Sequence, residues 1–174
     1  MKSATDILRD EHRVILHTLL SLEAADRLAA GRALPDGLWE EMVGWLRAFA
    51  DRTHHAKEEN VLFPAMIKAG VPSRGGPIDV MLEEHDQGRA LIATMASGVP
   101  AERSAAARRY VGLLRDHIEK ENALLFPLAD AVLEARAQAE LLREFASVEA
   151  ELGAQASLDA AEIAATRFAA VLRA

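Results

Sequence analysis

The 174-residue sequence predicts an all-α protein, an up-down-up-down four-helix bundle with extra C-terminal helices. Three observations favour this fold class. Alanine, leucine, glutamate and arginine, which form helices well, dominate the composition, and aromatic residues make up only 5% of it. Glycine and proline cluster only in short, widely spaced segments. Apolar residues between these segments recur three and four positions apart, as on the buried face of a helix.

The interruptions in this pattern set the expected helix boundaries. Ser3-Ala4-Thr5-Asp6 resembles a capping box, so a first helix begins there and runs over about 4–30. A second helix starts after Asp36 and ends before the glycine- and proline-rich loop 70–77. Pro64 and Pro127 fall late in the second and fourth helices, and we expect each to kink or end its helix. The third and fourth helices are expected over about 78–97 and 100–136.

The remaining C-terminal residues are rich in alanine, with Gly153 as a break. They predict one or two further helices. We therefore expect two parts of the chain: residues 1–136 as the four-helix bundle, and residues 137–174 as a C-terminal helical extension packed on it.

Composition and charge exclude several classes of function. The 20 basic and 27 acidic residues give a net charge of −7 with no basic stripe, which disfavours nucleic acid as a partner. The sequence contains no cysteine, so any metal must be held by histidine, aspartate, glutamate or water. The charged segment Arg9-Asp10-Glu11 comes before any apolar stretch long enough for a signal peptide or a membrane span. We therefore expect a cytoplasmic protein without a membrane partner.

Polar residues interrupt the apolar faces at helical spacing. His12 lies four residues after Leu8, and His85 lies four residues after Met81. In the fourth helix, His117 and Glu121 share a face with the apolar residues Tyr110, Leu113, Leu124 and Leu128. A buried imidazole or carboxylate without a partner costs several kcal/mol. A single histidine on such a face is ordinarily a hydrogen-bonded core residue, so only the arrangement of the set can indicate a site. In the second helix two apolar lines compete, one through Met42 and one through Leu46, and the sequence leaves open which of them faces inward.

Antiparallel helices would bring these histidines to one height. His12 and His54 each lie about 21 residues from the centre of the first connection, near residue 33. Across the second connection Glu58 and His85 match to within about five residues, and across the third His85 and His117 match to within about four, which is about 6 to 8 Å along a helix. One layer of the bundle therefore collects a histidine from every helix.

The sequence also repeats itself. Segment 57–64, KEENVLFP, matches segment 120–127, KENALLFP, with lysine, glutamate, leucine, phenylalanine and proline in register. Each copy has a histidine four residues before its shared glutamate, one helical turn away. Upstream of each copy, Glu11-His12 and Glu84-His85 supply the other half of the unit. The chain is thus a duplicated helix pair.

Four imidazoles and two carboxylates in a bundle core suit two first-row metal ions, because imidazole binds iron well and a carboxylate can bridge two ions. Zinc accepts the same ligands, but structural zinc sites usually place four ligands around one ion. We therefore expect a dinuclear centre, with iron favoured. Its candidate metal ligands are His12, His54, Glu58, His85, His117 and Glu121.

These segments resemble the hemerythrin-like (HHE cation-binding) family over about residues 4–130. The resemblance is carried by Glu11-His12, by the run from His54 to Pro64, by Glu84-His85, and by the run from His117 to Pro127. It implies a four-helix bundle with a non-haem di-iron centre, two iron ions joined by two carboxylates and an oxo or hydroxo group. By position, it implies that His12 and His54 bind one iron, that His85 and His117 bind the other, and that Glu58 and Glu121 bridge them.

The sequence departs from the oxygen-carrying members of that family. They have a further histidine one turn after the third-helix ligand, where this chain has Arg89, and their second carboxylate is usually an aspartate five residues after its histidine, where this chain has Glu121 at four. These departures disfavour reversible oxygen transport. They predict a more open site with two histidines for each metal.

Several neighbours of the candidate ligands have more than one interpretation. His55 is either an additional ligand, or a hydrogen-bond donor to a ligand, or a partly exposed neighbour. Glu11, Glu59 and Glu84 could orient ligand imidazoles, although solvated helix charges are the simpler expectation. Tyr110 could donate a hydrogen bond to a species bound at the iron, although a core position is the simpler expectation.

The resemblance and the ligand set together predict a di-iron protein that binds or senses O2, peroxide or nitric oxide. The alternative is a di-iron enzyme at the same site, acting in peroxide or nitric oxide detoxification or as a ferroxidase. Ferritin-like oxidases typically supply more carboxylates than this chain offers. A third hypothesis is a bundle in which the metal serves only stability and residues 137–174 dock a protein partner of unknown identity.

Overall fold

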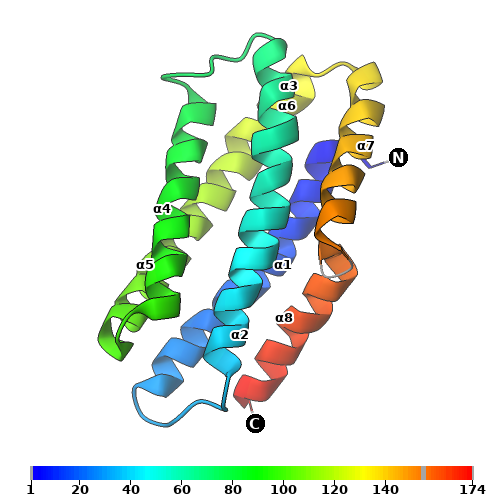
Figure 1. The fold of residues 1–174 in the computed structure, drawn as a ribbon. Helices are drawn as coiled ribbons and strands as arrows, with labels where there is room; N and C mark the ends of the chain where they lie inside the picture. The colour runs from blue at the N-terminus through cyan, green and yellow to red at the C-terminus, as the bar shows by residue number, and fades with distance from the viewer. Residues whose placement is uncertain (1, 154–155, 174) are drawn as a thin grey trace.

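The computed structural model describes residues 2–153 and 156–173, and all of their regular structure is helical, as predicted (Figure 1). Three of the helical segments have π winding and are labelled η. In chain order the elements are α1 (Ala4–Ala29), α2 (Leu38–Trp45), η1 (Leu46–His55), η2 (Glu58–Leu62), α3 (Phe63–Lys68), α4 (Pro77–Ser97), α5 (Pro100–Lys120), η3 (Glu121–Leu125), α6 (Phe126–Val132), α7 (Ala135–Leu152) and α8 (Leu158–Arg173).

The expected helix boundaries hold to within a few residues. Ser3 caps α1 as predicted: its hydroxyl accepts a hydrogen bond from the Asp6 amide at 3.1 Å, and the Asp6 carboxylate accepts one from the Ser3 amide. Elements α2 to α3 form one continuous rod, and α5 to α6 form another (Figure 1). Together with α1 and α4 these rods form a helical bundle. The rod formed by α5 to α6 ends at Val132, a few residues before the expected end of the fourth helix near residue 136.

The two late prolines do not end their helices. Each follows a π turn, in which the amide of Phe63 donates to the carbonyl of Glu58 and the amide of Phe126 donates to that of Glu121. Proline lacks an amide hydrogen and clashes with the carbonyl four residues back in an α-helix, and the wider π turn before it gives its ring more room. The prediction that Pro64 or Pro127 ends its helix is therefore wrong, and the winding changes from π to α at these positions.

The same π turn corrects the predicted buried face of the fourth helix. Leu124 was expected on that face, but it is 68% exposed, and Leu125 is buried in its place. A π turn contains more residues than an α turn, so it shifts the inward face by about one residue. In the second helix both apolar lines are buried, since Met42 and Leu46 are fully enclosed.

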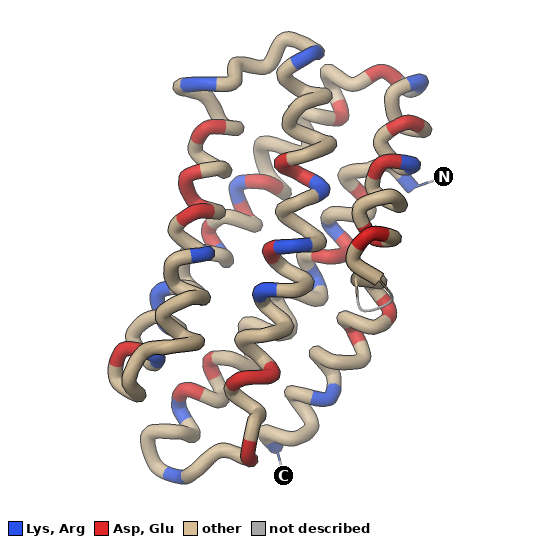
Figure 2. The backbone as a smooth tube through the Cα atoms, in the orientation of Figure 1, with Lys and Arg blue, Asp and Glu red and all other residues tan. Residues whose placement is uncertain are grey.

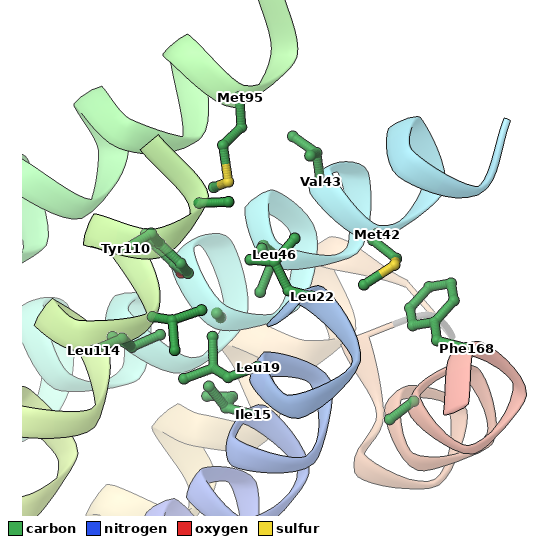
Figure 3. Close-up of a cluster of buried hydrophobic side chains, with 14 of the residues drawn as sticks. Ile15, Leu19, Leu22, Met42, Val43, Leu46, Met95, Tyr110, Leu114 and Phe168 are labelled. Carbon is green, nitrogen blue, oxygen red and sulfur yellow. The ribbon is translucent and has the colours of Figure 1, made fainter. Parts of the chain in front are cut away.

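The apolar core is divided into two clusters. One gathers the C-terminal half of α1 with α2, η1, the C-terminal part of α4, α5 and α8, including the side chains of Leu19, Leu46 and Tyr110 (Figure 3). The other gathers the N-terminal end of α1 with η2, α3, the N-terminal part of α4, η3, α6 and α7, including Leu8 and Phe63. Along every rod of the bundle, the predicted metal ligands lie where one cluster ends and the other begins.

Both C-terminal helices contribute to these clusters. Phe168 of α8 is buried beside Met42 in the first cluster (Figure 3), and Phe145 of α7 is buried in the second. In Figure 1, α7 and α8 lie along α1. The break between them follows Gly153, whose φ of 85° favours glycine, as the sequence predicted.

Charged residues of both signs are interspersed along the helices of the bundle (Figure 2). Within the described part of the chain, no helix combines the length and the apolar composition needed to cross a bilayer.

Phe168→Ala should lower the free energy of unfolding by about 3–5 kcal/mol, because it removes a fully buried ring from the first cluster. Urea denaturation followed by circular dichroism measures the change. The matched control in the same helix is Ile163→Ala, which removes a side chain that is 71% exposed and should cost less than about 0.5 kcal/mol. Equal losses for the two variants would contradict the described packing of α8.

Candidate metal centre

The structure brings all six predicted ligand side chains into one buried layer of the bundle. None of them is more than 1% exposed. They come from α1, η1, η2, α4, α5 and η3, so every rod of the bundle contributes, as the predicted depths required. The layer contains His12, His54, Glu58, His85, His117 and Glu121, and also His55.

The donor atoms of this layer fall into two groups, within each of which all of them lie within 4.8 Å of one another. Glu58 belongs to both groups, so the two groups are neighbours. We call them the first and the second metal group. The first group consists of His12, His54, Glu58 and Glu121, and the second of His55, Glu58, His85 and His117.

Each carboxylate lies between a histidine of one group and a histidine of the other. The two oxygens of Glu58 lie 3.5 Å from Nε2 of His54 and 3.5 Å from Nε2 of His85. Oε2 of Glu121 lies 3.1 Å from Nε2 of His12 and 3.3 Å from Nε2 of His117. Both side chains can therefore reach ions in both groups at once.

Two carboxylates orient imidazoles at equivalent positions of the sequence repeat. Nδ1 of His54 donates to Glu11 at 2.8 Å, and Nδ1 of His117 donates to Glu84 at 2.9 Å. Each glutamate directly precedes the first histidine of its own half. The simpler expectation, that these residues are solvated helix charges, is wrong: Glu11 is buried, and Glu84 is mostly covered by its contacts.

The other two imidazoles are oriented from the residue that follows each shared glutamate. Nδ1 of His85 donates to Glu59 at 2.7 Å, and Nδ1 of His12 donates to the side-chain oxygen of Asn122 at 3.0 Å. Glu59 was also expected to be solvated, and this contact corrects that expectation. The sequence analysis missed Asn122, although the repeat places it in register with Glu59.

Two lysines complete the pattern. Lys57 binds Glu11 and Lys120 binds Glu84, at matching positions of the repeat. Lys57 is fully buried because α7 covers it, and its ammonium also reaches Glu149 of α7 at 2.5 Å. Each lysine keeps its glutamate charged, so the glutamate accepts a strong hydrogen bond from the imidazole.

These contacts place a hydrogen on Nδ1 of each of the four rings. When Nδ1 donates to an oxygen, the neutral ring presents the lone pair of Nε2 to the interior of the layer, as metal-ligating histidines do. Eight buried donor atoms of the layer have no hydrogen-bond partner among the described residues: Nε2 of His12 and His54, both ring nitrogens of His55, and all four oxygens of Glu58 and Glu121. Leaving so many buried polar atoms unpaired is costly, and a cation bound among them would satisfy them.

Burial and charge set the protonation of the layer without metal. Burial lowers the pKa of His54 to about 4, and burial together with the charge of Glu121 raises the pKa of Glu58 well above its ordinary value. Burial also disfavours charge on His117 and Glu121. Their mutual attraction is stronger, so it raises the pKa of His117 to about 9 and holds the pKa of Glu121 well below its ordinary value. The His117 proton occupies a position where a metal ion would supply the positive charge.

Two neighbours behave differently from the ligands. The guanidinium of Arg89 donates to Asp51 at 2.7 Å and to Glu59, so it is held by carboxylates beside the second metal group. The ring of Tyr110 packs in the first apolar cluster, as the simpler expectation had it, and burial raises its pKa.

The fold and the layer together define a helical-bundle protein built to bind cations. The family model described as hemerythrin, "Hemerythrin HHE cation binding domain", matches residues 3–129. The chain belongs to this family, which confirms the resemblance seen in its sequence.

Similar curated proteins carry the name iron-sulfur cluster repair protein YtfE. The one from Musicola paradisiaca (strain Ech703) is 36% identical over 135 residues, covering 69% of this chain and 60% of the relative. The one from Escherichia coli (strain K12 / DH10B) is 33% identical with the same coverage. The chain thus spans about 60% of the length of these relatives. No solved structure matches the chain.

The metal-free protein should lose stability as the pH falls from about 6.5 to 4. The pKa values of His54, His55 and His85 are lowered by burial, so these groups take up protons on unfolding in this window and favour the unfolded chain. The expected loss is about 1.4 kcal/mol per pH unit for each histidine concerned. Within this window the raised pKa of Glu58 opposes the trend, whereas the raised pKa of His117 changes stability only above about pH 6.5. Urea midpoints measured between pH 6.5 and 4.5 test the prediction, and midpoints that rise on acidification would contradict it.

Glu84→Gln should weaken metal binding by about 10- to 100-fold, because an amide polarises the His117 ring less than a charged carboxylate does. Competition with a chromophoric chelator measures the affinity for Fe²⁺. The matched control is the adjacent exposed residue, in Glu83→Gln, which should bind as the wild type does. Equal affinities for all three proteins would show that the Glu84 contact does not support the site.

Proposed function

We propose that this chain is a non-haem di-iron protein of the hemerythrin-like type, which binds or senses O2, peroxide or nitric oxide at a carboxylate- and oxo-bridged centre. One observation carries the proposal: two adjacent groups of buried donor atoms share Glu58 and leave their oxygens and Nε2 atoms without hydrogen-bond partners among the described residues. Two ions bound side by side would satisfy both groups.

In this proposal His12 and His54 hold one iron, and His85 and His117 hold the other. Glu58 and Glu121 bridge them, which agrees with the position of each carboxylate between histidines of the two groups. Neutral imidazoles and carboxylates suit iron, and the absence of cysteine from the sequence removes the thiolate alternatives.

The bundle is proposed to have up-down-up-down topology over residues 1–136, with residues 137–174 as an extension packed on it. We also propose a cytoplasmic protein that requires neither a nucleic-acid nor a membrane partner. The net charge of −7 and the mixture of both signs along the helices support this part of the proposal (Figure 2).

The class of ligand follows from charge and access. Two ferric ions carry a charge of +6, and two carboxylates with an oxo bridge carry −4, so the centre keeps about +2 and favours anionic or reducible small ligands. The ligand side chains are at most 1% exposed, so only a ligand of a few atoms fits beside them without rearrangement of the helices. When bound, the iron pair supplies coordination positions and electrons for such ligands.

The chain's own residues prepare the centre for this role. Glu11 and Glu84 hold the rings of His54 and His117 with Nε2 directed inward, and Lys57 and Lys120 keep these carboxylates ionised. The apolar clusters on both sides exclude water from the layer. A preorganised set of donors loses little conformational entropy when it binds metal.

The second candidate function is a di-iron enzyme at the same site, acting in peroxide or nitric oxide detoxification or as a ferroxidase. Two imidazoles and two carboxylates give each ion only four protein donors, which leaves positions where a substrate could bind. The relatives are named iron-sulfur cluster repair proteins, and such repair is a further activity to be tested on this chain.

The proposal predicts that the protein, reconstituted anaerobically with Fe²⁺ and then exposed to air, contains about two irons per chain. Its near-ultraviolet absorption should show an oxo-bridged pair and change on addition of azide, peroxide or nitric oxide. Glu121→Ala should lose at least one iron and this absorption, because it removes a bridging carboxylate. The matched control, Glu119→Ala, alters an exposed residue near the end of α5 and should retain both.

Three outcomes separate the hypotheses. Sustained consumption of peroxide or nitric oxide would favour the enzyme. Stoichiometric binding without turnover would favour the binding or sensing role. A wild-type protein that stays folded and takes up no iron would overturn both.

A further inference from the structure

We propose that His55 is a seventh metal ligand, which gives the ion at His85 and His117 a third imidazole while the ion at His12 and His54 keeps two. This inference rests on the proposed di-iron centre and deepens it. It makes the two ions unequal, and it places the more open coordination sphere at His12 and His54.

The burial of His55 is the first observation. Its side chain is only 3% exposed, so it is not the partly exposed neighbour that the sequence allowed. Neither ring nitrogen has a hydrogen-bond partner among the described residues. The nearest carboxylate, Asp51, lies 3.7 Å from Nδ1, which is too far for a hydrogen bond. An imidazole that served only to fill the core would destabilise the fold by leaving both of its polar atoms unpaired.

The position of the ring is the second observation. The ring of His55 stacks on that of His85 with centroids 3.8 Å apart and planes inclined by 13°, and it stands edge-on to His117 at 5.7 Å. One of its nitrogens lies within 4.8 Å of the donor atoms of Glu58, His85 and His117. The three imidazoles of the second metal group thus come from three different elements, η1, α4 and α5.

The backbone explains how adjacent residues serve different groups. His54 and His55 end the π-helical segment η1, and both are buried although they are consecutive. His54 joins the first metal group and His55 joins the second. The π winding of η1 is supported by the hydroxyl of Thr53, which donates to the carbonyl of Ala48, five residues back, at 3.0 Å.

His55 supplies the third imidazole that is missing at the position of Arg89. The resemblance places a third histidine one turn after His85, where this chain has Arg89, and Arg89 is bound to Asp51 and Glu59. His55 reaches the same group of donors from the neighbouring rod. The second metal group therefore has three imidazoles, not the two per metal that the sequence indicated. A small anion added to the loaded protein should bind at the ion held by His12 and His54, which has fewer protein donors.

The decisive measurement is a crystal structure of the iron-loaded wild-type protein. We expect a ring nitrogen of His55 within about 2.3 Å of the iron that His85 and His117 hold, with azide on the other iron in a soaked crystal. A His55 ring with neither nitrogen within coordination distance, about 2.3 Å, of either iron would overturn the proposal and leave the di-iron centre intact. A wild-type protein without iron would overturn the proposed function as well.

A pair of variants gives an independent test. His55→Phe keeps a stacked ring but removes both nitrogens, and it should lower the affinity of one of the two iron positions by about 10- to 100-fold. The matched control is His17→Phe, which removes the one histidine of the sequence that lies outside both metal groups and should bind iron as the wild type does. Iron titrations with equal affinities in His55→Phe and the wild type would count against ligation. If His55→Phe does not fold, as judged by circular dichroism, the wild-type crystal structure still decides.

Discussion

The constraint on which this structure depends is the cost of burying a polar layer in the middle of an apolar core. Two carboxylates and five imidazoles lie between two hydrophobic clusters, and most of their inward-facing atoms have no partner among the described residues. Such a layer is tolerable only if something else supplies the missing interactions, and a pair of cations is the simplest group that does so. The helices on either side supply the apolar area that compensates for the burial.

The duplicated helix pair also orients the imidazoles, so that Nε2 of each ring faces the interior of the layer. Each half places an acceptor just before its first histidine and another just after its shared glutamate, and the hydrogen bonds cross between helices. The orienting acceptors of the two halves differ at one position, where Asn122 stands in place of Glu59. The ring of His12 is therefore oriented by a neutral amide oxygen, whereas the other three rings are oriented by carboxylates, which accept stronger hydrogen bonds.

Much of this could be predicted from the sequence, for identifiable reasons. The helices follow from apolar spacing and from capping signals such as Ser3, and the convergence of the six candidate ligands follows from the repeat and from helix length. The π turns could not be predicted from the sequence. They depend on how Pro64 and Pro127 combine with the packing of neighbouring helices, and helix propensities do not distinguish π from α winding. That is why Leu124 was placed on the wrong face. The roles of Glu11, Glu84 and Asn122 depend on contacts between rods, and local sequence carries no signal for them except their matched places in the repeat.

The fully buried Lys57 has a consequence for the C-terminal helices. Its ammonium is shared between Glu11, which accepts the hydrogen bond of His54, and Glu149 of α7, a helix that lies beyond residues 3–129 of the family match. The hydrogen bond that polarises His54 therefore depends on a lysine that α7 also holds. If a metal bound at His54 strengthened this hydrogen bond, it would change the free energy with which α7 packs on the bundle, and the packing of α7 would change the metal affinity by the same factor.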